Sequence, residues 1–213
     1  MKFTDTLKTT IMACHDQSVH HPFIQQLVDG SLPKETFRYY LCQDHQYLRN
    51  FQHLHELVAK HLPADDAKLL LSLGAGEDQA RQALHQALQI TLAELDQTSP
   101  APTNYAYITH MYYQLTKFGV AVATAGLLPC YWLYNEVGKG LAQKQSPDPL
   151  YQAFFDSYGG EDFTTSTTQM REIVDRLALQ VDQPTQTLMR GAFAKSCYYE
   201  VHFWQMALTK ENW

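Results

Sequence analysis

A thiol and a phenol lie one helical turn apart in the apolar segment 127–134, which reads LLPCYWLY. Cys130 and Tyr134 are four residues apart, so a helix would place both on one face. Proline is tolerated in a first helical turn, and the residue before it is pushed out of helical geometry. A kink or a new helix start at Pro129 would therefore bring Cys130 close to a helix N-terminus, where unpaired N–H groups favour a thiolate. The alternative is that Cys130 is a small buried apolar residue, as most free cysteines are.

Two acids interrupt apolar helix faces elsewhere in the chain. Asp44 and Tyr47 are three residues apart on an amphipathic segment, and Glu200 shares a face with Phe203 and Trp204. An aromatic environment is expected to raise the pKa of Glu200 and to keep a proton available there. Each acid taken alone could instead lie at the solvated rim of its helix. Together, however, a thiol, two carboxylates and several phenols from separate helices are what a site in a bundle core requires.

Helical signals position these groups. Apolar residues recur at spacings of three and four through most of the chain, and no segment alternates with a period of two between hairpin signals. We therefore predict one all-α domain, a helical bundle over residues 1–213. Ser31 is expected to cap a long helix that begins with a proline in its first turn. The predicted helices cover residues 3–14, 16–28 with an interruption near 21–22, 33–61, 63–95 with either a bend or a break at 74–76, 105–117, 120–144, 148–157, 161–179 and 184–207.

Composition excludes several classes of protein. The chain has 213 residues with 45% hydrophobic, 12% aromatic and 18% charged side chains, and its formal charge is −6. A net negative charge provides no basic surface for nucleic acid or for an anionic membrane, so neither is expected as a partner. Few charges and many aromatic rings fit a large core, or subunit interfaces together with an aromatic-lined pocket.

The sequence contains no motif that indicates a metal site and no signal for secretion. The four cysteines form no CxxC pair, and the ten histidines include no Glu-x-x-His tetrad of the kind that binds helical di-iron centres. No segment resembles a signal peptide, and no apolar run reaches the length that spans a membrane. We expect a cytoplasmic protein without a metal or an organic cofactor.

Five sequence blocks in order resemble the TenA (thiaminase II) family, and they span nearly the whole chain: residues 21–23 (HPF), 40–48 (YLCQDHQYL), 127–134 (LLPCYWLY), 158–163 (YGGEDF) and 200–204 (EVHFW). The resemblance implies the haem-oxygenase-like helical architecture, a homotetramer and the activity of an aminopyrimidine aminohydrolase in thiamine salvage. Such enzymes convert 4-amino-5-aminomethyl-2-methylpyrimidine to the 5-hydroxymethyl pyrimidine and ammonia, and they also cleave thiamine.

The resemblance also implies roles for the matching residues. Cys130 would be the nucleophile, Glu200 the proton donor, and Tyr47 the residue that supports the nucleophilicity of the thiol. The substrate-binding residues would be an acid and several aromatic residues: Asp44, Tyr134, Tyr158, Tyr107 and Phe203.

Two alternatives belong to other classes of protein. A regulatory protein could bind the pyrimidine without catalysis, and the same architecture also serves haem or di-iron oxidoreductases. Ligand binding without hydrolysis would favour the first alternative, and a coloured purified protein would favour the second.

Overall fold

Helices make up all of the regular structure that the computed structural model describes, which comprises residues 1–74, 77–141 and 144–213. The N-terminal half contains a 3-10 turn η1 (Thr4–Leu7) followed by α1 (Lys8–Val19), α2 (Pro22–Asp29), α3 (Lys34–Ala59), α4 (Ala64–Gly74), α5 (Glu77–Ala87) and α6 (Leu92–Gln97). The C-terminal half contains α7 (Pro102–Phe118), α8 (Val120–Leu141), α9 (Pro149–Gly159), α10 (Glu161–Ala178) and α11 (Gln183–Thr209). The prediction of an all-α fold is confirmed.

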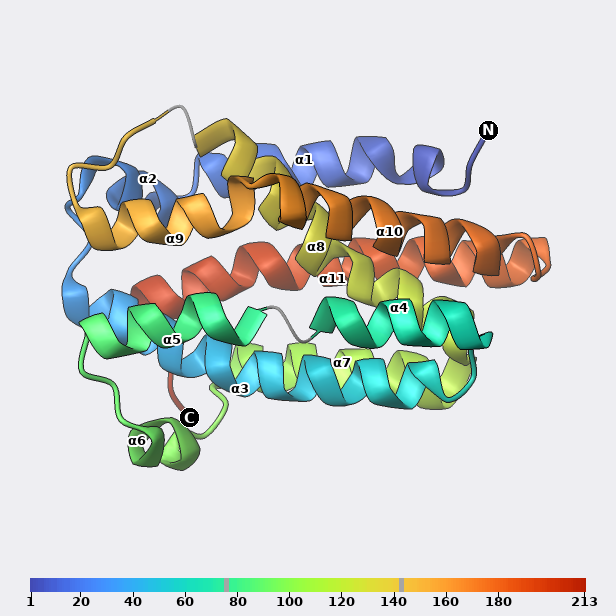
Figure 1. The fold of residues 1–213 in the computed structure, drawn as a ribbon, viewed down its shortest axis with the longest axis horizontal. Helices are drawn as coiled ribbons and strands as arrows, with labels where there is room; N and C mark the ends of the chain where they lie inside the picture. The colour runs from blue at the N-terminus through green and yellow to red at the C-terminus, as the bar shows by residue number, and fades with distance from the viewer. Residues whose placement is uncertain (75–76, 142–143) are drawn as a thin grey trace.

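The bundle is organised around α8 and α11. These two helices pack against each other, and α8 also contacts α1, α7, α9 and α10. Figure 1 shows α9 and α10 on one side of α11, with α3, α4, α5 and α7 on the other side. The central position of α8 explains its sequence, because a helix that is covered all round is apolar on every face.

Most helix starts follow from their sequences. The side chains of Asp148 and Asp182 accept backbone N–H bonds in the first turns of α9 and α11, and each is followed by a proline in that turn. The start of α3 differs from the prediction, since Pro33 occupies the N-cap position without a side-chain hydrogen bond. Ser31 lies too early to cap α3, and its backbone N–H is held by Asp29 at 2.9 Å.

The helix around the cysteine is continuous. Pro129 lies inside the 22-residue α8 (Val120–Leu141), so the helix predicted over residues 120–144 is present, and a new helix start at this proline, one of the two alternatives considered, is wrong. Proline has no N–H, and the carbonyl of Ala125 therefore lacks its usual donor within the helix. Burial along nearly the whole of α8 outweighs this loss, because tertiary packing supplies most helical stability. Cys130 is consequently a mid-helix residue, and no helix N-terminus favours its thiolate.

The structure also differs from the prediction between α5 and α6, because these two helices are separate where one continuous helix was predicted. Gln89 has a φ of 54° in the left-handed region, which ends the helical path after Ala87. The Thr91 hydroxyl then accepts the Glu94 N–H at 3.2 Å and starts α6.

The interior is rich in aromatic rings that carry polar atoms. Buried phenols need partners, and the Tyr131 hydroxyl lies 2.9 Å from Nε2 of His55, while the Tyr151 hydroxyl donates to the Leu32 carbonyl at 2.5 Å. The largest side chains that are almost fully buried include Trp204, Tyr40, Tyr107, Tyr131, Tyr151, Phe23, Phe37 and Phe51.

Candidate active site

The thiol of Cys130 is buried at the centre of the bundle, with Tyr134 one turn further along α8. Tyr47 of α3 and Tyr107 of α7 approach it from two other helices. Burial raises the pKa of both tyrosines well above the usual range, and the nearby Cys130 raises each of them further. The buried sulfur therefore lies near two phenol groups.

The carboxylate of Glu200 belongs to the same group of side chains. Glu200 is 2% exposed, and its Oε1 accepts a hydrogen bond of 2.7 Å from the Tyr107 hydroxyl. The Tyr107 ring centroid is 4.9 Å from that of Tyr47, and the two phenol groups interact with each other as well as with Glu200. Both phenols stay protonated near neutral pH, because their pKa values are raised. Tyr47 can therefore donate a hydrogen bond to a thiolate or to a bound ligand.

A second polar group surrounds Asp44. This carboxylate is 3% exposed on α3, and its Oδ2 accepts a hydrogen bond from Nε of Arg81, which lies on α5. Arg81 also donates from Nη2 to the Tyr158 hydroxyl. Burial alone would lower the pKa of Arg81, but Asp44 and the nearby tyrosines raise it well above its usual value. Asp44 and Tyr158, both predicted to bind the substrate, are thus joined by one cation.

Tyr134 connects the two groups. Its ring centroid is 4.7 Å from that of Tyr158, and its hydroxyl is 3.4 Å from the Tyr40 hydroxyl. Burial is the main reason that the pKa of Tyr134 lies well above the usual range, and Tyr40, Glu200, Tyr158 and Asp44 all raise it further. The carboxylates of Asp44 and Glu200 therefore both raise the pKa of the Tyr134 phenol, so both acids lie near Tyr134.

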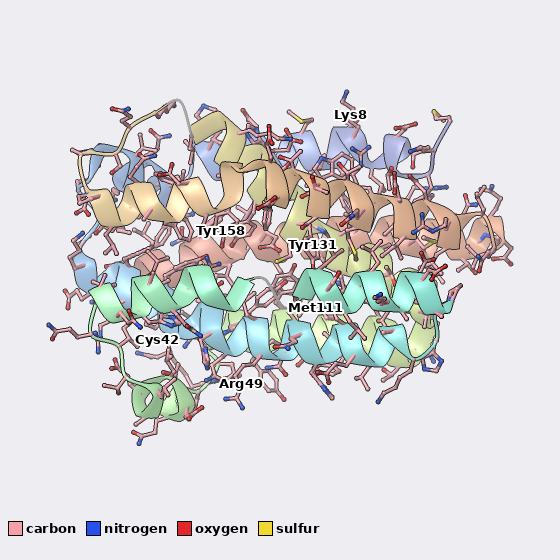
Figure 2. All side chains as sticks on the ribbon, viewed as in Figure 1. Lys8, Cys42, Arg49, Met111, Tyr131 and Tyr158 are labelled. Atoms are coloured by element: carbon pink, nitrogen blue, oxygen red, sulfur yellow. The ribbon has the colours of Figure 1, made fainter. Side chains whose placement is uncertain are left out.

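Aromatic rings form the walls of this region. The Phe203 ring centroid is 5.9 Å from that of Tyr47 and 5.8 Å from that of Tyr40. Figure 2 shows Tyr158 in the central part of the view, near the passage from α9 to α10. Flat rings of this kind can hold a planar heterocycle by stacking.

The structure brings the predicted site residues together from five helices. All of them are less than 9% exposed, and they are Asp44 and Tyr47 of α3, Tyr107 of α7, Cys130 and Tyr134 of α8, Tyr158 of α9, and Glu200 and Phe203 of α11.

Sequence reasoning missed Arg81. Its guanidinium is as deeply buried as the acid that it pairs with, at 7% and 5% side-chain exposure. The sequence around Arg81 is polar, and nothing in it marks this arginine as buried. The one available signal was the scarcity of cations in a chain with only 16 Lys and Arg residues. The partners of Arg81 are 37 and 77 positions away, which no local pattern encodes.

The other cysteines have different contacts. The contact with Cys14 and burial raise the pKa of Cys197, and Glu200 is close enough to raise it further. Burial raises the pKa of Cys42, and the charged groups that act on it are Glu94 and Arg38, on the side of α3 that faces α6. Cys42 therefore faces another way than Asp44. Cys14 of α1 donates its S–H to the Cys197 carbonyl of α11 at 3.2 Å.

Two negative findings concern the described part of the chain. Among the residues whose side chains the structure describes, which leaves out 74–80 and 142–143, no three His, Cys, Asp or Glu side chains are grouped as metal ligands. Among the same residues, no helix combines the length and the apolar character needed to cross a bilayer.

The fold and the site together define a helical protein of the haem-oxygenase-like type with a buried thiol and carboxylate centre. A domain of unknown function from Shewanella denitrificans, described as having a heme oxygenase-like fold, superposes with a TM-score of 0.75 at 13% identity over 99% of this chain and 93% of that one. The model of the TENA/THI-4/PQQC family matches residues 10–210. The chain belongs to this family.

Relatives with assigned names cover the chain fully. The aminopyrimidine aminohydrolase of Bacillus subtilis is 35% identical over all of this chain and 92% of its own length. A protein of the same name from Halalkalibacterium halodurans is 27% identical over all of this chain and 98% of its own length. The TenA homologue from P. horikoshii has a TM-score of 0.88 at 25% identity, over 98% of this chain and 99% of that one.

Proposed function

We propose that this chain is a cysteine-dependent aminopyrimidine aminohydrolase, which hydrolyses 4-amino-5-aminomethyl-2-methylpyrimidine to the 5-hydroxymethyl pyrimidine and ammonia, and also cleaves thiamine. The observation that carries the proposal is the buried grouping of Cys130 with Tyr47 and Tyr107, in which Tyr107 donates to Glu200. The names of the full-length relatives support the same reaction.

The reaction needs a nucleophile because the aromatic ring resists direct loss of the amine from the methylene group on C5. In the proposed first step, the Cys130 thiolate forms a bond to ring carbon C6 and Glu200 delivers a proton to a ring nitrogen. The ring is then no longer aromatic, and its electrons expel the protonated amine as NH3. An exocyclic C=CH2 bond remains on C5.

Water completes the proposed cycle. As its oxygen bonds to the exocyclic methylene, water gives up one proton to the released ammonia, and the electrons of the C=CH2 bond return to the ring. The bond between the sulfur and C6 then breaks, the ring regains aromaticity, and the ring nitrogen returns its proton to Glu200. The net change is replacement of the amine by a hydroxyl group from water, so no electrons are gained or lost overall. General acid assistance of this kind is typically worth about 10²- to 10⁴-fold in rate.

The remaining site residues fit the shape and polarity of the substrate. In the proposal, Asp44 and Tyr158 bind the 4-aminopyrimidine edge, and Tyr134 lies beside them. Phe203 provides a flat wall, and the hydroxyl of Tyr47 stabilises the thiolate because its raised pKa keeps it a donor.

The test of this proposal is product analysis with the purified protein. Incubation with the aminomethyl pyrimidine in ¹⁸O-labelled water should release one ammonia per hydroxymethyl pyrimidine, with the label in the new hydroxyl group. Binding of the pyrimidine without turnover would contradict the enzyme assignment and would favour a regulatory protein.

We further propose that the protein is cytoplasmic, that residues 1–213 form one domain, and that four chains assemble. The 24.4 kDa mass of one chain gives a tetramer of about four times that value, which light scattering coupled to gel filtration measures directly. The low proportion of charged residues supports extensive subunit contact.

A further inference from the structure

Arg81 is a buried cation for which the proposed chemistry has no role. Its side chain is 7% exposed, whereas the arginines of two other ion pairs, Arg38 with Glu94 and Arg176 with Asp66, are 33% and 43% exposed. Burying a charge is costly unless it is paired and hydrogen-bonded. A cation at this depth therefore needs a specific reason for its position.

The contacts of Arg81 are those that the substrate would need. Its guanidinium donates to Asp44 and to Tyr158, the two groups proposed to hold the pyrimidine edge. The guanidinium carbon is 5.1 Å from the Tyr158 ring centroid and 5.6 Å from that of Phe154, so it also covers aromatic faces. The Arg81 side chain thus hydrogen-bonds to the groups proposed to bind the pyrimidine edge and also covers aromatic faces next to them.

The chemical shapes of the two groups match. A guanidinium is a flat cation that presents two N–H groups on an N–C–N edge, and such an edge pairs with a carboxylate. A 4-aminopyrimidine protonated on N3 presents the same edge, with one N–H on the ring and one on the amino group. Asp44 can therefore exchange one planar cation for the other without losing its charge partner.

We propose that Arg81 pairs with Asp44 and Tyr158 in the substrate-free protein, competes with the substrate for these two groups, and is displaced when the substrate binds. This inference rests on the proposed function, because it takes Asp44 as the pyrimidine ligand. It makes Arg81 a determinant of specificity. A pyrimidine without the 4-amino group cannot replace the guanidinium, since it would leave Asp44 buried without a charge partner.

Displacement also sets the apparent affinity. If a ligand binds only after Arg81 has moved, its apparent affinity equals its intrinsic affinity multiplied by the fraction of molecules in which the site is open. Hydrogen bonds to charged groups contribute enough that this fraction is about one tenth or less. Removal of the guanidinium should therefore tighten binding about tenfold or more, although it removes a buried ion pair.

The test uses 4-amino-2,5-dimethylpyrimidine, an analogue without a leaving group, and measures its dissociation constant by calorimetry. We expect the dissociation constant to be about tenfold or more lower for Arg81→Ala than for the wild type, while the thermal midpoint falls. Arg176→Ala, which removes a more exposed arginine from an ion pair, should bind like the wild type. Added methylguanidinium should compete with the analogue in Arg81→Ala.

An unchanged or higher dissociation constant in Arg81→Ala would overturn the inference, because a purely structural arginine weakens binding when it is lost. If Arg81→Ala fails to fold, Arg81→Lys serves instead. It keeps the charge but not the planar edge, and its dissociation constant must still fall below that of the wild type. Analogue binding that responds as expected in a protein without ammonia release would defeat the proposed function and leave this inference standing.

Discussion

Gly138 of α8 lies where the end of α9 comes closest to the central helix. A methyl group at this position would be 2.6 Å from the Tyr158 carbonyl carbon and 2.7 Å from the backbone nitrogen of Gly159. Both are backbone atoms, so no flexible side chain can move aside. Ordinary contacts begin near 3.4 Å, and Gly138→Ala must therefore push the end of α9 away from α8 by several tenths of an ångström or more.

The substitution should affect both stability and function. Overpacking of this kind costs about 1–3 kcal/mol, which exceeds the gain of about 1 kcal/mol that alanine brings to an unstrained helix position. Because the displaced backbone carries Tyr158, substrate binding should suffer as well. A shift on the order of 1 Å in a positioning group can cost about 10²-fold in rate.

Gly191 provides the matched control. It lies in α11, where a methyl group would meet nothing within 4 Å, so Gly191→Ala should be stabilising by about 0.5–1 kcal/mol and leave activity unchanged. Urea unfolding and the kinetics of ammonia release measure the two effects. If Gly138→Ala matched Gly191→Ala in both assays, the close approach of α8 and α9 would have no part in positioning Tyr158.

Two further predictions concern the acid and the pH dependence. Glu200→Gln should lower kcat about 10²- to 10⁴-fold with little change in the unfolding midpoint, and a fully active variant would exclude Glu200 as the proton donor. Burial lowers the pKa of His55 to about 4 from 6.5. The unfolded chain therefore takes up this proton first, and the free energy of unfolding should fall by roughly 2 kcal/mol between pH 7 and pH 5 on account of this histidine. Urea unfolding at the two pH values should show a smaller fall for His55→Gln, and an equal fall would contradict the assignment.

The elements of the fold were predictable because their signals are local. Asp148 and Asp182 precede prolines, and the structure places a helix start at each. Apolar spacing likewise indicated the long helix that carries Asp44 and Tyr47. The helix predicted over residues 120–144 is present, but the new start considered at Pro129 is not. The cost of a proline is known from the sequence, whereas the burial that compensates for it depends on helices far along the chain.

The site was predictable only in part, for the same reason. Cys130 and Tyr134 share a helix face by their spacing, and the structure retains that relation. The hydrogen bond from Tyr107 to Glu200 joins residues 93 positions apart, so it follows from the packing of α7 against α11. Arg81 could not be found at all, because only tertiary structure reveals that its charge is buried.

The most direct test of the account compares two cysteine variants on neighbouring helices. Cys130→Ser removes the proposed nucleophile, while Cys42→Ser removes a thiol that lies two residues from Asp44 but faces α6. Ammonia release from 4-amino-5-aminomethyl-2-methylpyrimidine should fall about 10³-fold or more in Cys130→Ser and stay close to the wild-type rate in Cys42→Ser. A Cys130→Ser variant that releases ammonia at the wild-type rate would contradict the central claim that this sulfur attacks the ring.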